Sequence, residues 1–202
     1  MKLKNSTAYT GEKFNDLDFV NGKLEQSEFL DCLFVGCNLS ESAFVKCRFS
    51  ECTFKQCNLN LIKFDSSKLI ETHFKNSKLT GINWTALDWS SFRLMAPMFF
   101  ESCDLSFSLF NGLELQELGM QDCKAHDVDF SECDLRDSDF FRTDFLDARF
   151  ALTIAAFIFP RITLLSSALI SSISPSRPFA VSLSIFCSSD SLSSLDADLV
   201  SG

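Results

Sequence analysis

A five-residue repeat constrains the fold of this chain more than any other feature. Residues 43–59 read AFVKCRFSECTFKQCNL, and every fifth residue is large and apolar. On an α-helix, steps of five rotate successive Phe side chains by about 140°, and on a flat strand they alternate between the two faces. A single interior stripe survives only if each pentad also turns the chain by about 90°, so that four pentads close one coil. The sequence therefore predicts a solenoid with about twenty residues per coil.

The register of this repeat can be followed through most of the chain. The central apolar residue of each pentad recurs seventeen times from Phe14 to Leu94, slips by one residue near 95–99, and recurs eleven times from Phe100 to Phe150. These pentads predict an all-β fold, a quadrilateral β-helix of about seven coils and roughly 34 Å in height. The predicted domains are a lead-in over residues 1–12, the β-helix over 13–150 and a Ser-rich apolar tail over 151–202.

The slip in register coincides with Pro97. Proline cannot donate to a strand ladder, and an added residue behaves like a bulge. The sequence therefore predicts a kink or a small loop between two stacks of coils. A tolerated insertion at one corner and a functional loop are both open interpretations of it.

Eight of the nine cysteines occupy the position two residues before the central one, which other pentads fill with Ser, Thr or Ala. Free cysteine packs as a small hydrophobe, so we expect small inward-facing thiols rather than a disulfide framework. Thiols fit a reducing compartment, and residues 1–14 contain no apolar run typical of a signal peptide, so the expected location is cytoplasmic. These cysteines are Cys32, Cys37, Cys47, Cys52, Cys57, Cys103, Cys123 and Cys133.

The composition changes after Phe150. Residues 151–202 contain three acids and two arginines among many Ser and apolar residues. A poorly ordered or associating tail and a reading-frame artefact are both compatible with this composition. A membrane span over 151–170 is disfavoured because Pro160 and Arg161 lie at its middle.

Acidic residues are concentrated in one part of the repeat. Residues 1–100 hold 11 acids and 12 bases, whereas residues 101–150 hold 13 acids and 4 bases. The formal net charge of −9 argues against non-specific binding to nucleic acid or to an anionic membrane. Twelve acids lie immediately before or two after a central residue, where side chains should face solvent: Asp104, Glu114, Glu117, Asp122, Asp127, Asp129, Glu132, Asp134, Asp137, Asp139, Asp144 and Asp147.

Carboxylates on successive coils would lie ~5 Å apart, a spacing comparable to that of phosphates along a nucleic-acid strand. Like charges at this distance repel, so such a cluster requires an explanation. One interpretation is a DNA-like surface that competes for a basic groove. The other is an acidic face that only keeps the column in solution.

Catalysis finds little support in the sequence. His73 and His126 are both predicted to face solvent, each separated from a partner by the register. Cys123 and His126 could be written as a metal-binding or nucleophilic pair, but the cysteine faces inward and the histidine outward. No phosphate-binding loop, zinc spacing or nucleophile elbow is present. The sequence predicts a protein that is not an enzyme and holds no cofactor or metal.

Several pentads, among them CNLSE, CDLRD, SDFFR and TDFLD, resemble the Ala-(Asp/Asn)-Leu-X-X motif of the pentapeptide-repeat family. The resemblance covers about residues 12–150 and implies a right-handed quadrilateral β-helix. The stretches CNLNLIKF, GINWTALDW and FESCDLSFSLFNGLEL are particularly similar to the albicidin-resistance member, which groups with the Qnr quinolone-resistance proteins.

Those members resemble B-form DNA in shape and charge, act on DNA gyrase and topoisomerase IV, and protect these enzymes from inhibitors. The resemblance therefore implies a DNA mimic with one of these enzymes as partner. Members of this group also dimerise through a C-terminal segment, which the residues after Phe150 do not match, so a homodimer is left open. The alternatives are a generic protein-interaction scaffold and a column tethered to a membrane through residues 151–170.

Overall fold

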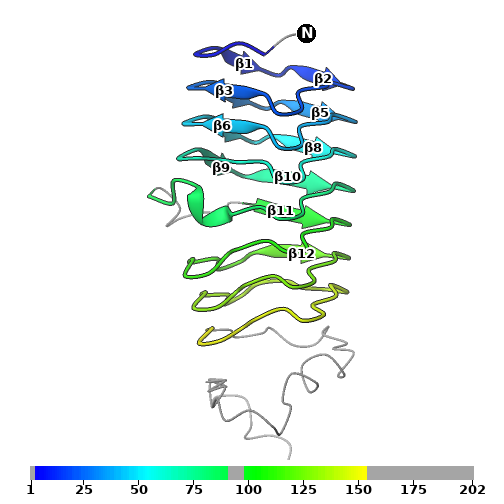
Figure 1. Ribbon diagram of the computed structural model, residues 1–202, viewed down its shortest axis with the longest axis vertical. Coiled ribbons are helices and arrows are strands. Elements are labelled where there is room, and N and C mark those ends of the chain that lie inside the picture. The colour runs from blue at the N-terminus through cyan, green and yellow to red at the C-terminus, as the bar shows by residue number, and fades with distance from the viewer. Residues whose placement is uncertain (1–2, 91–97, 154–202) are drawn as a thin grey trace, which may run out of the picture.

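The chain winds into a four-sided column of short parallel strands (Figure 1). The computed structural model describes residues 3–90 and 98–153. Each strand in these ranges has three or four residues, and one 3-10 turn, η1, spans Trp84–Ala86. The strands are β1 Ala8–Thr10, β2 Lys13–Asn15, β3 Lys23–Glu25, β4 Glu28–Leu30, β5 Leu33–Val35, β6 Ala43–Val45, β7 Arg48–Ser50, β8 Thr53–Lys55, β9 Lys68–Ile70, β10 Thr72–Lys75, β11 Met98–Glu101 and β12 Gly119–Gln121.

Strands from successive coils pair in parallel. One sheet has the order β1-β4-β7-β9, a second has the order β12-β11-β10-β8-β5-β2, and β3 pairs with β6. In the second sheet Phe14 lies opposite Phe34, and Phe34 lies opposite Phe54, so neighbouring coils are twenty residues apart. The predicted all-β fold, a quadrilateral β-helix with four pentads per coil, is confirmed.

The regular strands extend over fewer turns than the pentad count predicts. The six strands of the longest sheet are separated by five turns of the coil, whereas about seven coils are predicted. Beyond Gln121 the column continues through isolated bridges such as Gly119 to Asp139. In these pentads the chain turns tightly, as where Ser138 N donates to Leu135 O at 3.3 Å. Only one residue on each side of the column then pairs with the next coil.

Most corners of the coil are made by a residue in the left-handed region, but Ala86 in η1 is not one of them. The non-glycine corner residues have φ between 48° and 63°, and they include Asp16, Glu41 and Asp137. The corner N–H donates to a carbonyl nineteen residues further on, as in Asp16 N to Val35 O at 2.9 Å. A left-handed residue costs roughly 1–2 kcal/mol, and this hydrogen bond to the next coil offsets part of the cost.

The interior is a set of stacked aromatic rings. Phe14, Phe34 and Phe54 lie one above another, with ring centroids 4.7 and 4.5 Å apart and ring planes within 10° of parallel. Rings from adjoining sides meet edge to face, as between Phe44 and Phe49 at 85°. All of these side chains are buried, so successive coils share one continuous dry core.

The eight cysteines predicted to face inward are buried and free. The Cys52 thiol donates to Phe29 O at 3.4 Å, and the Ser67 hydroxyl donates to Phe44 O, also 23 residues back, at 2.9 Å. This shared acceptor explains why Cys and Ser interchange at this position. Burial raises the pKa of Cys52 to about 12 and that of Cys133 to about 11, so both are protonated at neutral pH.

The column begins before residue 13, and the predicted lead-in over residues 1–12 is therefore wrong. Strand β1 already pairs with β4, and the Tyr9 ring stacks on Phe29 at 5.0 Å and 10°. A tyrosine fills the central position here, with its hydroxyl accepting a hydrogen bond from Lys4 N at 2.9 Å. The predicted register begins at Phe14 and leaves this first pentad out.

The interruption of the repeat adds six residues to a coil. Phe74 lies opposite Phe100, which is 26 residues away instead of twenty. Six residues are one more than a full pentad. In the sequence the insertion therefore appears only as a slip of one residue. Leu94 and Pro97 lie outside the described residues, as does the predicted tail after residue 153.

The described ranges contain no helix long and apolar enough to cross a membrane. Most of the segment 151–170, considered above as a possible span, lies outside those ranges.

Trp84 gives a test of the stacked core. Its ring lies on Phe64 at 6.0 Å and on Phe110 at 5.5 Å, and its Nε1 is buried without a hydrogen-bond partner among the described residues. Trp84→Phe keeps the stack and removes the unpaired N–H, so the free energy of unfolding should change by less than about 2 kcal/mol. Phe110→Ala should lower it by about 3–5 kcal/mol. Urea denaturation measures both, and equal losses would contradict this account.

Candidate protein-interaction surface

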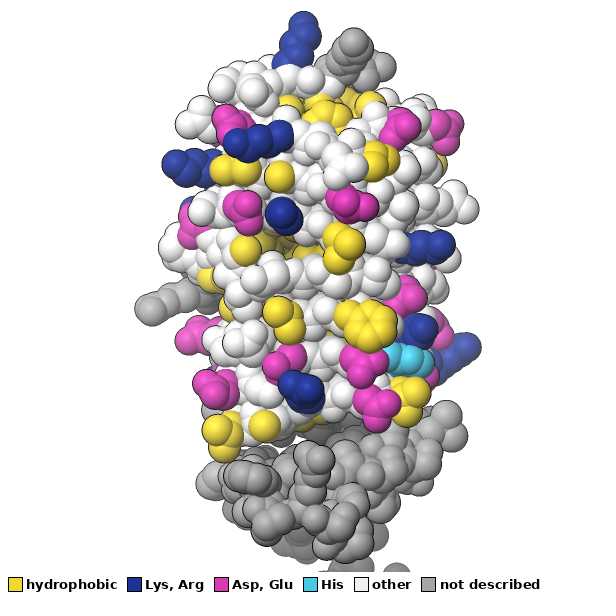
Figure 2. All heavy atoms as spheres, viewed as in Figure 1, with side chains coloured by type: hydrophobic (Ala, Val, Ile, Leu, Met, Phe, Trp, Pro, Cys, Tyr) yellow, Lys and Arg dark blue, Asp and Glu magenta, His cyan; other side chains and the backbone are white. Residues whose placement is uncertain are grey.

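The twelve predicted surface acids surround the column in its C-terminal coils, and we call them the acidic belt. None of the twelve is buried, so their predicted outward orientation is confirmed. They occupy all four sides, because Asp104, Glu114, Asp129 and Asp139 take part in bridges of four different ladders. Figure 2 shows one face of the column, where acidic side chains lie among basic and hydrophobic ones. The belt therefore encircles the column and is not confined to one face.

Acidic side chains stack directly in only some of the ladders. Glu114 lies opposite Asp134, which places two carboxylates on neighbouring coils. In another ladder Lys124 lies between Asp104 and Asp144, and in a third Asp129 lies between Leu109 and Arg149. Interleaved bases therefore reduce the repulsion that an unbroken carboxylate column would create.

The aspartates that precede a central residue have a structural role. Oδ1 of Asp129 accepts a hydrogen bond from Ser131 N at 2.9 Å, and Oδ1 of Asp139 accepts one from Phe141 N at 3.1 Å. Asn58 does the same in an N-terminal coil, accepting from Asn60 N at 3.3 Å. These are Asx turns, which an amide closes as well as a carboxylate. The turn accounts for the side-chain oxygen in this position but not for its charge.

The other acids of the belt lie at corners. Six of them have φ between 52° and 62°: Glu117, Asp122, Asp127, Glu132, Asp137 and Asp147. Asp is among the residues that tolerate the left-handed region best. Their side chains lie at the edges of the column, where Asp122 Oδ1 accepts from Arg142 Nε at 2.9 Å.

The strongest ion pair of the belt joins Arg136 to Asp134. Nε and Nη2 of Arg136 lie 2.9 and 2.6 Å from the two carboxylate oxygens, and Gln116 Nε2 donates to the same carboxylate at 2.5 Å. The Arg136 guanidinium holds the pKa of the Asp134 carboxyl below its ordinary value.

Most of the belt remains uncompensated. Eight of its acids have no ion-pair partner within 4.0 Å among residues 3–90 and 98–153: Glu114, Glu117, Asp127, Asp129, Glu132, Asp137, Asp139 and Asp147. The belt therefore presents a strong negative field to solvent.

The two histidines have neighbours that the sequence did not reveal. His126 Nε2 lies 2.6 Å from Asp144 Oδ2, so the prediction that this histidine lacks a partner is wrong. The partner is 18 residues away, which is the adjacent position on the next coil. His73 stacks on Phe99 at 4.8 Å, and burial lowers the pKa of its imidazole.

The possible pairing of Cys123 with His126 is not formed. The buried Cys123 thiol donates to Gln121 O at 3.1 Å, while His126 contacts Asp144 at the surface. The described part of the chain holds no group of three or more His, Cys, Asp or Glu side chains placed to bind a metal.

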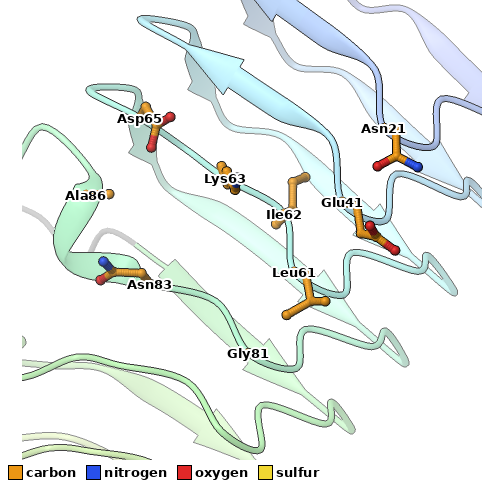
Figure 3. Close-up of a pocket in the computed structure, with 9 residues that line it drawn as sticks. All are labelled: Asn21, Glu41, Leu61, Ile62, Lys63, Asp65, Gly81, Asn83 and Ala86. Atoms are coloured by element: carbon orange, nitrogen blue, oxygen red, sulfur yellow. The ribbon is translucent and has the colours of Figure 1, made fainter.

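A surface groove and an apolar edge lie beside the belt, and neither was predicted. The groove has a volume of about 520 Å³ and runs along the side between Leu61 and Ala86 (Figure 3). Leu61 and Phe107 occupy corner positions and are exposed by 52% and 63%. An apolar residue where other pentads carry Asp, Asn or Gly is a signal that the sequence does contain.

Two family models match the chain. One describes a pentapeptide repeat region and matches residues 27–97, and the other describes eight copies of pentapeptide repeats and matches residues 120–154. Together they cover more than half of its length. The chain belongs to the pentapeptide-repeat family. No curated protein matches it significantly.

Solved structures of pentapeptide-repeat proteins resemble this family member. A trypsin-treated variant of QnrB1, a plasmid-mediated fluoroquinolone resistance protein, is 21% identical, with 72% of this chain and 80% of that chain covered and a TM-score of 0.41. Full-length QnrB1 is 15% identical over 75% and 87% of the two chains, with a TM-score of 0.30. HetL, involved in heterocyst differentiation regulation in the cyanobacterium Nostoc, is 12% identical over 75% and 87%, with a TM-score of 0.25.

The Asx turn at Asp129 separates the structural role of this position from its charge. Asp129→Asn keeps an oxygen that accepts from Ser131 N, so the free energy of unfolding should stay within about 0.5 kcal/mol of the parent. Asp129→Ala removes the acceptor and should cost about 1 kcal/mol. Urea denaturation of both variants at neutral pH measures the difference. Equal stability of the Ala variant and the parent would show that the turn does not need this hydrogen bond.

The Arg136–Asp134 pair predicts a dependence of stability on pH. The pKa of Asp134 is lower in the folded chain than in the unfolded chain, where it is about 3.9. The pair therefore stabilises the fold above that unfolded value, and this contribution is lost as the pH falls through the lower folded value. Arg136→Ala should raise the pKa of Asp134 in an NMR titration and flatten this part of the pH–stability curve. An unchanged titration would contradict the pairing.

Proposed function

We propose that this protein is a DNA mimic that binds DNA gyrase or topoisomerase IV and protects the enzyme from inhibitors. The observation that carries the proposal is the charge density of the acidic belt. Residues 101–150 hold 13 acids and 4 bases, a net of −9, on about two and a half coils. At ~4.8 Å per coil this is roughly one charge per 1.3 Å, comparable to the one charge per ~1.7 Å along duplex DNA.

The distribution of the acids around the column supports the same function. A duplex presents phosphates around its circumference, and a protein groove built for duplex DNA contacts it from more than one side. Because the belt occupies all four sides, it meets such a groove with negative charge on each wall. A single acidic face would fit only one wall.

The partner comes from the resemblance of the pentads to the topoisomerase-protecting members of the pentapeptide-repeat family. In this function the protein acts by binding alone, without catalysis, cofactor or metal, and does not bind nucleic acid itself. The N-terminal coils are nearly neutral, with 11 acids and 12 bases in residues 1–100, so the contact falls on the C-terminal coils. A cytoplasmic location follows from this partner.

A second candidate is a protein-interaction scaffold with no topoisomerase partner. The Asx turns favour it, because they give the aspartates before the central residues a role in the fold without any partner. Salt discriminates between the two functions. A charge-driven complex weakens steeply with ionic strength, whereas a packing-driven scaffold contact changes little.

A gyrase supercoiling assay in the presence of a fluoroquinolone tests the proposal. The parent protein should restore supercoiling, and a variant with Asp129, Asp134, Asp139 and Asp144 changed to Asn should be at least tenfold less potent. The Asn side chains keep the acceptors of the Asx turns, so this variant should stay folded.

The matched control changes the same number of charges in the N-terminal coils, with Asp16, Asp18, Asp31 and Asp65 replaced by Asn. It should protect gyrase as well as the parent does. Equal potency of the belt variant and the control would contradict mimicry by the belt. No protection by the parent, on gyrase or on topoisomerase IV, would contradict the topoisomerase proposal as a whole.

A further inference from the structure

One corner of the column carries an apolar edge, formed by Leu61, Gly81, Phe107 and Leu109. Leu61, Gly81 and Phe107 occupy the same corner on three successive coils, and Leu109 lies two residues beyond Phe107. Leu61, Phe107 and Leu109 are exposed by 52%, 63% and 42%. The Leu61 side chain leans over Gly81, since a Cβ there would lie 2.6 Å from Leu61 Cδ2. The Leu61 side chain therefore extends along the corner over the coil that lies between it and Phe107.

Phe107 is costly for the folded chain in two ways. Its φ of +63° places a bulky side chain in the left-handed region, whereas the same corner carries Gly81 on one neighbouring coil and Asp127 on the other. Phe107 is also more exposed than any other aromatic residue in the part of the chain that the structure describes. The corner itself is part of the fold, because Phe107 N donates to His126 O on the next coil at 2.9 Å, but an exposed aromatic ring is not required there. The exposed ring therefore points to a role in binding.

The apolar edge runs directly into the acidic belt. Asp127 occupies the next corner position after Phe107, and Asp147 the one after that. Leu109 lies opposite Asp129, which in turn lies opposite Arg149. The backbone of His126 accepts from Phe107 N, and its side-chain Nε2 contacts Asp144. Four carboxylates against one arginine and one histidine give the rim of the edge a negative charge.

The groove beside the edge is lined by both polar and apolar side chains. Figure 3 shows Leu61 and Gly81 at its corner, with Lys63, Asp65 and Asn83 along its length. A partner that covers Phe107 and Leu61 therefore also meets a recess of about 520 Å³.

We infer that the apolar edge is the anchor of the complex and inserts Phe107 into an apolar pocket bordered by Lys or Arg on the partner protein. The inference rests on the proposed function, because it places this pocket on the topoisomerase beside its basic DNA-binding groove. Exposed charges steer association and weaken with salt, whereas a few buried aromatic anchors control dissociation. The edge and the belt therefore supply different parts of one interface.

The test is binding of purified DNA gyrase holoenzyme to the immobilised full-length protein, followed by biolayer interferometry. Phe107→Asn should raise the dissociation rate at least tenfold and leave the dependence of the association rate on salt unchanged. The belt variant with four Asn substitutions should instead lower the association rate and flatten that dependence. The matched control is Leu30→Asn, which removes another exposed leucine on β4 and should bind as the parent does.

Folding is checked separately. Asn tolerates the left-handed region, so Phe107→Asn should melt at the same temperature as the parent or higher. A parent that binds with Phe107→Asn dissociating no faster would overturn the anchor and leave the proposed function standing. A parent that binds neither gyrase nor topoisomerase IV in the same assay would overturn both. Faster dissociation of Phe107→Asn, with an unchanged melting temperature and an unaffected Leu30→Asn control, would support both.

Discussion

The left-handed corner is the constraint on which the rest of this structure depends. A strand of three residues cannot turn through a right angle and stay in register unless one residue leaves the β region. Here a residue with positive φ does so at the described corners outside η1. The conformational cost of the left-handed residue is offset in part by a hydrogen bond to the next coil, as from Glu41 N to Asn60 O at 2.9 Å. Because these corners repeat this geometry, central side chains such as Phe34 and Phe54 fall above one another and can stack at 4.5 Å. The aromatic core is thus a consequence of the turns.

This dependence explains how much of the fold was predictable from the sequence. A period of five has one solution that keeps an apolar stripe inside, so the four-sided column and the inward cysteines followed from counting. Counting pentads fails where an insertion is longer than one pentad. An insertion of six residues before Phe100 looks like a slip of one, because six and one leave the same remainder after division by five. Tyr9 was missed because a tyrosine takes the place of Phe in the first pentad. Its ring has the same shape, and its hydroxyl accepts a hydrogen bond from Lys4 N.

The surface was less predictable than the core because neighbours there come from different coils. Positions of the acids and their outward orientation followed from the register. Their ion pairs did not, since Arg136 bonds Asp134 two residues away whereas His126 contacts Asp144 on the next coil. A carboxylate stacks on another carboxylate or alternates with a base according to the residue twenty positions away. This arrangement is found only when pentads of neighbouring coils are compared. The apolar corner at Phe107 was visible in principle, because a Phe replaces the Asp or Gly that a left-handed residue favours.

The belt and the edge together explain how an acidic solenoid can select one partner, beyond attracting basic proteins through its charge. Long-range attraction by exposed carboxylates is fast but weakly selective, and physiological salt screens it over ~8 Å. Selectivity requires contacts that exclude water, which charged side chains such as Asp127 cannot supply without a large desolvation cost. An exposed aromatic ring beside them can, because its burial releases free energy without leaving a charge unpaired. The choice of Phe at this corner then has a physical rationale: the corner projects the ring away from the column, where a partner can cover it.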